Sequence, residues 1–336
     1  SGSDGGTAIG HGALATQNRD GSKNTAIGYN ALTALRATGG GNYGGIQNTA
    51  VGYEAGGSGV FGGGADGNGD DNTLLGYQAG KAITTGADNT FVGSAAGTAL
   101  TSGTYNVAIG GNAGMAMTNN SQNIAIGYGA LDATAADAHF NIAIGTSALG
   151  AENSNASYCV AIGQNALILQ NANVKNTAIG GLAGAELQGG TDNTLIGYQA
   201  GNQLDLNEGG NTFVGHDAGS NADGAEANTF IGAYAGGLGV ATGNDNVCVG
   251  YAAGYDLTDG PGNVLIGEAA GVNMTTGDYN VAIGYQAADG LVGAANYNIA
   301  IGSNALGGCT AATSGNIAIG VSALEHASYA AANINL

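Results

Sequence analysis

Apolar positions recur along this chain in one short pattern that repeats almost from end to end. Residues 123–127 read NIAIG, and close variants of this segment end on a glycine, here called the repeat glycine, in 18 copies. The repeat glycines are Gly10, Gly28, Gly52, Gly76, Gly93, Gly110, Gly127, Gly145, Gly163, Gly180, Gly197, Gly215, Gly232, Gly250, Gly267, Gly284, Gly302 and Gly320. Apart from two early intervals of 24 residues, neighbouring repeat glycines are 17 or 18 residues apart. Such a period predicts a solenoid, in which neighbouring coils bury each other's apolar edges.

The three residues before each repeat glycine have the chemistry of a β-strand. All 18 copies carry Ile, Val or Leu one residue before the glycine and Thr, Val or Ile three residues before it. These side chains suit a pleated surface, and two residues apart they point to the same face. The position between them, here called the middle column, is also apolar and is mostly Ala. Both faces of the strand are therefore predicted to be dry.

Two further positions in the repeat suggest how the coils are joined. Asn stands four residues before the repeat glycine in 16 of 18 copies, with Gly6 and Cys159 as the exceptions. Stacked Asn side chains can hydrogen-bond one coil to the next. A second apolar residue follows seven residues after the glycine in many copies and predicts a second, less regular strand in each coil. Its members include Ile83, Leu100, Met117, Leu187, Leu204, Leu257 and Met274.

These patterns predict an all-β fold, a parallel β-solenoid of 18 coils that forms one continuous domain over residues 1–336. At a strand spacing of about 4.8 Å, such an array would extend for about 85 Å. Glycine-rich insertions near residues 39–45 and 56–71 lengthen two coils without breaking the pattern. Asn333, Ile334 and Leu336 match the start of a nineteenth copy, so we expect the sequence to be a piece of a longer protein.

The doubly apolar strand also predicts self-association. A roll built from two sheets covers one face of this strand, and the face carrying the middle column would be wet in a monomer. Association about a shared axis would cover it. The expected interface residues are Ala125, Ala143, Ala161, Phe91, Phe213 and Phe230.

The charge balance excludes two classes of partner. The net charge is −19, and Lys and Arg together number only 5. Nucleic acid and anionic membrane surfaces both require basic residues, so neither is an expected partner. No run of 18 apolar residues is present, so we expect no membrane insertion. The three cysteines, Cys159, Cys248 and Cys309, are expected to be buried free thiols.

Receptor-contact candidates lie in the variable positions of the repeat. The residue after the repeat glycine is tyrosine at Tyr29, Tyr53, Tyr77, Tyr128, Tyr198, Tyr251 and Tyr285. A partly exposed tyrosine row could contact a glycan or a protein, although tyrosine also packs over turns. Tyr43, Val60 and Phe61, in the two insertions, could act as contact tips of loops.

Metal binding and catalysis receive little support from the sequence. Asp71, Asp88, Asp192 and Asp245 directly precede the repeat Asn and could hold calcium between coils, but Asp is also a common turn residue. No other cofactor is indicated. The histidines His11, His139, His216 and His326 are far apart in sequence, so we expect no enzyme. A hexapeptide-repeat acyltransferase would need three hexapeptides in each coil, and only one occurs.

The repeats resemble those of two groups of fibrous proteins. Segments such as NTAIGYNAL, NIAIGYGAL and NVAIGYQAA are similar to the NTAIGYQAG repeats of phage tail-fibre-like and bacterial surface proteins, which often end in an endosialidase-type intramolecular chaperone. They also resemble the NSVAIG-type repeats in the head of trimeric autotransporter adhesins. The resemblance implies a homotrimer of left-handed β-rolls on a virion or cell surface. It also implies a structural and adhesive fibre that attaches to a surface glycan or protein receptor.

An ice-binding solenoid is the alternative function. It would use the threonines three residues before the repeat glycine: Thr25, Thr49, Thr73, Thr90, Thr177, Thr194, Thr212 and Thr229. Val and Ile interrupt this row, and we expect it to be buried, which disfavours the alternative.

Overall fold

The computed structural model describes most of the chain in two compact units, Ser1–Asn173 and Val174–Leu336. The described residues are 5–15, 23–34, 45–57, 69–133, 137–150, 157–171, 175–205, 208–237, 242–308, 314–326 and the backbone of 334–335. Tyr43, Val60, Phe61 and Cys309 lie outside the described residues, as do most of the two insertions. The single-domain organisation stays a prediction.

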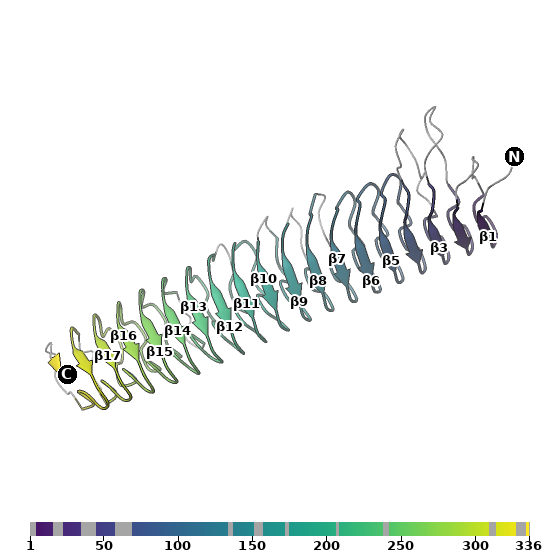
Figure 1. Ribbon diagram of the computed structural model, residues 1–336. Coiled ribbons are helices and arrows are strands. Elements are labelled where there is room, and N and C mark those ends of the chain that lie inside the picture. Colours follow the sequence, from purple (N-terminus) through teal and green to yellow (C-terminus); the bar gives the residue numbers. More distant parts are fainter. Residues whose placement is uncertain are drawn as a thin grey trace. The chain divides into compact units, whose positions relative to one another are not determined.

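The fold class predicted from the repeats is confirmed: the chain is an all-β parallel β-solenoid. Each coil of the first unit has one three-residue strand that ends directly before the repeat glycine. These strands are β1 (Thr7–Ile9), β2 (Thr25–Ile27), β3 (Thr49–Val51), β4 (Thr73–Leu75), β5 (Thr90–Val92), β6 (Val107–Ile109), β7 (Ile124–Ile126), β8 (Ile142–Ile144) and β9 (Val160–Ile162). They lie side by side in chain order and point the same way (Figure 1).

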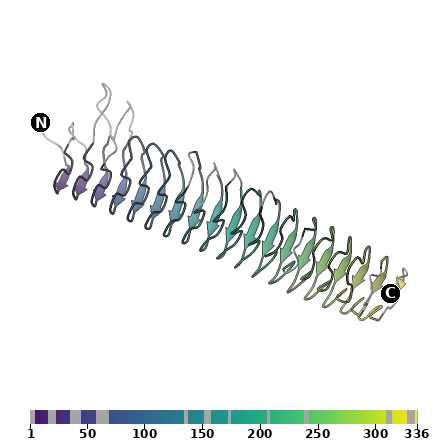
Figure 2. The same cartoon turned by 180° about the vertical axis from the view of Figure 1, so that it is seen from behind.

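The second unit repeats this arrangement (Figure 2). Its strands are β10 (Thr177–Ile179), β11 (Thr194–Ile196), β12 (Thr212–Val214), β13 (Thr229–Ile231), β14 (Val247–Val249), β15 (Val264–Ile266), β16 (Val281–Ile283), β17 (Ile299–Ile301), β18 (Ile317–Ile319) and the two-residue β19 (Ile334–Asn335). Within each unit, consecutive strands pair in parallel with equivalent repeat positions opposite each other, as Ala125 of β7 pairs with Ala143 of β8.

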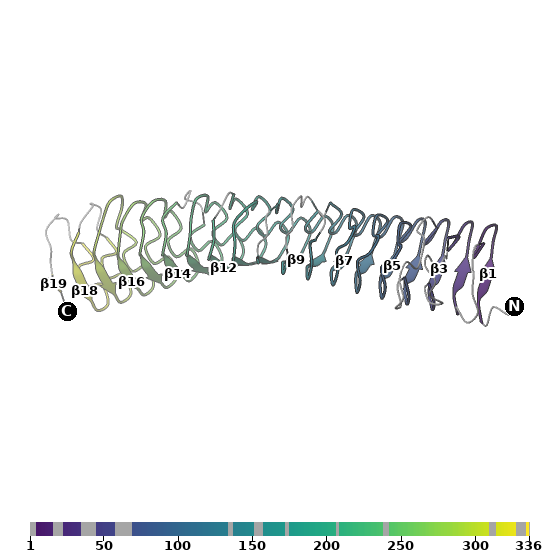
Figure 3. The ribbon, with the colours of Figure 1, turned by 90° about the horizontal axis from the view of Figure 1, so that it is seen from above.

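The predicted second strand of each coil is wrong for the residues that the structure describes. Seen from above, the strands of each unit lie along one side of the coils and irregular backbone forms the other side (Figure 3). The apolar residues assigned to the second strand are nevertheless fully buried, as Ile83 and Leu100 are. Backbone hydrogen bonds still join the coils on this side, such as Ala82 N to Thr98 O at 3.1 Å. Burial without strand geometry satisfies the apolar pattern equally well.

The middle column of the strands faces the inside of its own coil, which corrects the predicted interface. The six expected interface side chains are all 0% exposed in a single chain: Ala125, Ala143, Ala161, Phe91, Phe213 and Phe230. A second chain cannot reach them. Their face was misassigned because the strand is apolar on both faces, so its pattern does not indicate which face turns inward.

Side-chain sizes inside a coil compensate for each other. In the coil of β5, a Cβ atom at Gly97 would lie 2.3 Å from the ring of Phe91 in the middle column. In the coil of β8, the middle column holds Ala143, and the position equivalent to Gly97 holds the buried Leu149. One large residue therefore fills the core from either position. In other coils a third position supplies the bulk, as Met117 does in the coil of β6, where Ala108 and Gly114 are both small, since interiors are close-packed.

The Asn column forms the coil-to-coil hydrogen bonds that the sequence predicts. Oδ1 of Asn89 accepts hydrogen bonds from the backbone N and from Nδ2 of Asn106, both at 3.0 Å. Asn106 Nδ2 also donates to the carbonyl oxygen of Asn120, at 2.7 Å. Asn89 and Asn106 are completely buried. These buried amides thus have partners in neighbouring coils, which offsets the cost of burying them, although Nδ2 of Asn246 is buried without a hydrogen-bond partner.

Candidate functional site

The outer β-face consists of the first and third residues of each strand, and in a single chain these residues are half-buried in most strands, such as β7, and exposed in others, such as β4. In β4 both of these residues, Thr73 and Leu75, are exposed while the middle residue is buried. Ile109 of β6 and Ile231 of β13 are each 39% exposed. Within each unit, parallel pairing aligns these residues into continuous rows of Thr, Val and Ile. The face inferred to be buried is therefore the one that contacts solvent.

The tyrosines that follow the repeat glycines are exposed, as the sequence predicts. Their exposed fractions are 45% for Tyr29, 44% for Tyr53, 51% for Tyr77, 64% for Tyr128, 49% for Tyr198, 57% for Tyr251 and 49% for Tyr285. The first three stack in a row with His11, at ring-centroid distances of 5.2 to 5.4 Å. Each ring in this row covers the face of its neighbour, so mainly ring edges are available to a ligand.

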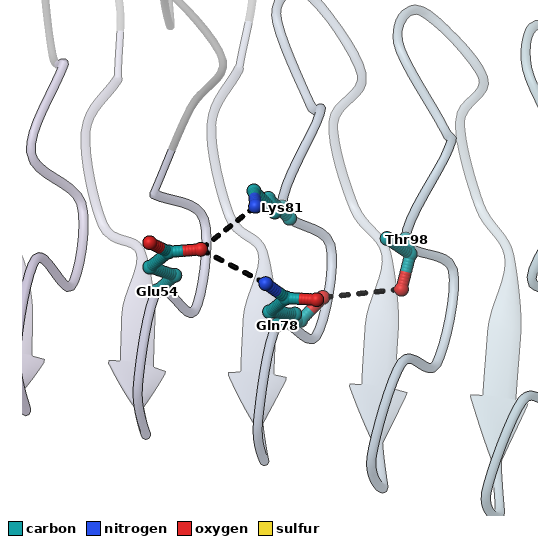
Figure 4. A network of polar contacts seen from close by, with 4 residues as sticks. All are labelled: Glu54, Gln78, Lys81 and Thr98. Carbon is teal, nitrogen blue, oxygen red and sulfur yellow. Dashed lines mark hydrogen bonds and ion pairs between the residues drawn. The ribbon is translucent and has the colours of Figure 1, made fainter.

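A polar network lies beside this tyrosine row (Figure 4). The carboxylate of Glu54 accepts a hydrogen bond from Gln78 Nε2 at 2.9 Å and pairs with Lys81 Nζ at 2.7 Å. The hydroxyl of Thr98 donates to the carbonyl oxygen of Gln78 at 3.3 Å. Hydrogen bonds from Lys81 and Gln78 lower the pKa of Glu54, and the charge of Glu54 raises the pKa of Tyr53. The network links three consecutive coils at the surface.

A second aromatic row was not predicted from the sequence. Aromatic residues directly precede the position of the repeat Asn in several coils, and two pairs stack: Phe140 with Tyr158 at 4.8 Å, and Tyr279 with Tyr297 at 5.6 Å. Tyr158 and Tyr297 are 58% and 64% exposed. The recurrence of aromatic residues at this one repeat position was the signal that could have revealed the row.

A tyrosine-lined pocket lies in the second unit, and of its lining residues only Tyr251 was a receptor-contact candidate from the sequence. It is about 350 Å³ in volume and is lined by Tyr234, Tyr251, Ala252, Tyr255 and Val272. Tyr234 follows β13, whereas Tyr251 and Tyr255 follow β14. These tyrosines occupy three different positions of the repeat, so no single alignment column reveals the pocket.

The four calcium candidates share a backbone conformation. Asp71, Asp88, Asp192 and Asp245 have φ between 55° and 61°, the left-handed region that Asp tolerates well. This conformation explains Asp at these positions without a metal. Within the described ranges, no three His, Cys, Asp or Glu side chains gather in a way that could hold a metal ion.

The histidines and cysteines occupy separate structural environments. His139 Nδ1 accepts a hydrogen bond from the backbone N of Ser121, and His216 Nδ1 lies 3.0 Å from Asp217 Oδ2. Cys159 and Cys248 are buried free thiols, as the sequence predicts. Burial raises the pKa of the Cys248 thiol far above its usual value, which keeps this thiol protonated and unreactive. Among the described residues, no helix has the length and apolar character needed to cross a bilayer.

Comparison of the chain with models of known protein families and with curated protein sequences finds no match. The fold places the chain in the class of parallel β-solenoid repeat proteins.

Proposed function

We propose that this chain is a structural and adhesive segment of an extracellular fibre, on a virion or a cell surface, that associates with further copies of itself. The observation that supports this most directly is the outer β-face. Its Thr, Val and Ile rows remain accessible in a single chain. An apolar surface that continues from coil to coil is unfavourable in water and favours a partner with the same repeat.

A second copy fits this surface better than an unrelated partner does. Equivalent rows on two copies have the same coil spacing, so β-branched side chains can pack in register along the length of each unit. Three copies about one axis would also agree with the repeats' resemblance to trimeric, left-handed β-rolls. The tyrosine rows at the strand ends would then be the receptor-contact surface for a glycan or protein. We propose no enzymatic role.

The self-association experiment changes two outward-facing residues. Ile126→Asp with Ile144→Asp places carboxylates in the third-position row of β7 and β8, while the core of the coil is unaltered. Light-scattering mass should fall from that of an oligomer to that of a monomer, with circular dichroism unchanged. Tyr128→Asp, at an exposed turn position, is the matched control and should leave the mass unchanged. A parent protein that is monomeric at all concentrations would contradict the proposal.

The Ala143→Asp variant tests the inner face of β8, whereas Ile144→Asp changes its outer face. Ala143 is 0% exposed inside its coil, so the new carboxylate would be buried with no cationic partner. The expected cost is about 3–5 kcal/mol in the free energy of unfolding. Thermal melting at low protein concentration should detect this loss even where the protein is monomeric. A variant that melts like the parent but no longer associates would place the interface on the inner face instead.

Ice binding is a second candidate function because the Thr row, which was expected to be buried, is accessible to solvent. The Thr row is at the surface, with Thr49 and Thr73 exposed and Thr90 half-buried. Parallel strands hold these hydroxyl and methyl groups in a regular array, which is the feature that an ice-binding surface needs. A thermal-hysteresis measurement on the parent and on a Thr49→Lys, Thr73→Lys variant decides between the two functions. No hysteresis in the parent would remove this candidate.

A further inference from the structure

The tyrosine-lined pocket differs from the stacked aromatic rows in the orientation of its rings. Tyr234 and Tyr251 meet at 84° with centroids 5.9 Å apart, and Tyr234 and Tyr255 meet at 73° with centroids 6.3 Å apart. Tyr29 and Tyr53, by contrast, are nearly parallel at 10°. Perpendicular rings do not cover each other's faces as stacked rings do. The pocket therefore combines several aromatic surfaces around one volume of about 350 Å³.

The permanently charged side chains near the pocket are negative, and one histidine, His216, contacts Tyr234 with ring centroids 5.4 Å apart. From Asn176 to Leu336 the chain has no Lys or Arg. Asp256 follows Tyr255, and its backbone N donates to the carbonyl oxygen of Val272 at 3.0 Å, so this acidic residue belongs to the pocket's surroundings. Glu268 occupies the repeat position of Tyr251 in the next coil. Negative charge near exposed π-faces favours a cationic ligand.

We propose that the pocket formed by Tyr234, Tyr251 and Tyr255 binds a quaternary or fully methylated ammonium group. Its other lining residues, Ala252 and Val272, are apolar, so among the described residues that line the pocket the phenolic hydroxyls are the only polar side-chain atoms. A sugar ring would need partners for several hydroxyls. A methylated ammonium group has no N–H to satisfy and is attracted to aromatic faces. This ligand class deepens the proposed adhesive function, on which its biological role rests.

Other coils of the repeat show which residues can replace those of the pocket without changing the backbone conformation. Ala252→Gln should fill the pocket, because Gln78, Gln199 and Gln286 stand at the equivalent position with the same positive φ. Tyr251→Ser should remove one aromatic wall, because Ser94 occupies the equivalent position in another coil. The control is Ala269→Gln, the same change as Ala252→Gln at an equivalent position that does not line the pocket. Unchanged circular dichroism and melting will establish that each variant is folded.

The experiment titrates the full chain with tetramethylammonium chloride and follows tyrosine resonances by NMR. Ala252→Gln and Tyr251→Ser should each weaken binding by about tenfold, which corresponds to about 1.4 kcal/mol, while the control stays within about twofold of the parent. Choline should bind about tenfold more tightly than 3,3-dimethylbutan-1-ol, its neutral isostere, because only choline carries the charge. Absent tetramethylammonium binding, equal binding of the isostere, or equal binding by the pocket variants would overturn the proposal.

Competition identifies the source of the ammonium group. Phosphocholine and trimethyllysine both carry it. Stronger competition by phosphocholine would indicate a headgroup as the natural ligand, and stronger competition by trimethyllysine would indicate a modified protein. If neither displaces tetramethylammonium, the inference is wrong. The titration is repeated on the Ile126→Asp, Ile144→Asp variant. Tetramethylammonium binding by a parent protein that is monomeric at all concentrations would refute the fibre proposal alone, whereas a parent protein that associates without binding tetramethylammonium would refute only the pocket.

Discussion

At the scale of single residues, backbone conformation explains most of the strictly repeated positions. The repeat glycine adopts φ values that other residues avoid, such as 132° at Gly127, and it lies directly over the next coil. A Cβ atom at Gly127 would be 2.6 Å from the carbonyl oxygen of Gly145. Close backbone contact between coils therefore requires glycine here. Turn positions with φ near 55°, by contrast, tolerate Asn, Gln, Asp and Ser throughout the chain.

Gly127→Ala should consequently lower the free energy of unfolding by at least about 2 kcal/mol, through backbone strain and overpacking. Denaturant unfolding monitored by circular dichroism measures this loss. The control is Gly129→Asn, two residues along, where φ is 61° and Asn30 occupies the equivalent position of another coil. It should change stability by less than about 0.5 kcal/mol. Equal effects at the two sites would show that the coil-to-coil contact does not limit residue 127.

At the scale of one coil, the core is a shared volume filled from two positions. The coil of β5 combines Phe91 with Gly97, and the coil of β7 combines Ala125 with Leu131. Both arrangements occur on the same backbone, since Gly97 and Leu131 have φ of 56° and 53°. These two coils thus place a large residue at different positions, and in the coil of β5 a Cβ atom at Gly97 would overlap the Phe91 ring.

A double-mutant cycle tests this compensation. Phe91→Ala alone should cost about 3–5 kcal/mol because it leaves a cavity. Gly97→Leu alone should also destabilise, because a Cβ atom at this residue would lie 2.3 Å from the Phe91 ring. The double variant reproduces the pairing of β7 and should be more stable than either single variant, as measured by denaturant unfolding. Additive losses in the double variant would show that the two positions do not share one volume.

At the scale of the whole molecule, acidic residues dominate the electrostatics. The net charge is −19, and burial raises the pKa of several carboxyl groups, among them Asp70, Glu208 and Asp289. Glu208 Oε1 accepts a hydrogen bond from the backbone N of Gly224, but its Oε2 is buried without a hydrogen-bond partner. Ionising such groups in the folded state is unfavourable, so they oppose folding when charged.

Lowering the pH from about 7 to about 5 should therefore stabilise the protein. A carboxyl group with a raised folded-state pKa binds more protons when folded than when unfolded, so its contribution to stability increases as pH falls through that folded pKa. Thermal melting should give a higher Tm at pH 5 than at pH 7, and Glu208→Gln should reduce the difference. Glu226→Gln, at an exposed carboxylate, is the control. A Tm that falls over this range would contradict the assignment of buried, unfavourable carboxylates.

The sequence by itself determined the architecture, because period and local chemistry carry that information. The 17- to 18-residue spacing predicted the solenoid, the β-branched positions predicted each strand, and the Asn column predicted the hydrogen bonds between coils. Each of these features depends on residues within one repeat and on their counterparts in the next. The exposure of the tyrosines after the repeat glycines was predictable for the same reason, since variable residue types at a turn indicate solvent contact.

Only the tertiary structure decided which strand face points inward and which residues meet at the surface. A strand that is apolar on both faces carries no alternation, so the burial of Ala143 and the exposure of Ile109 depend on how the remainder of the coil folds back. The prediction of a second strand in each coil was wrong because buried residues in irregular backbone can have the same apolar spacing as residues in a strand. The pocket of Tyr234, Tyr251 and Tyr255 combines three repeat positions from two coils, and such proximity follows from the path of the turns rather than from the repeat period.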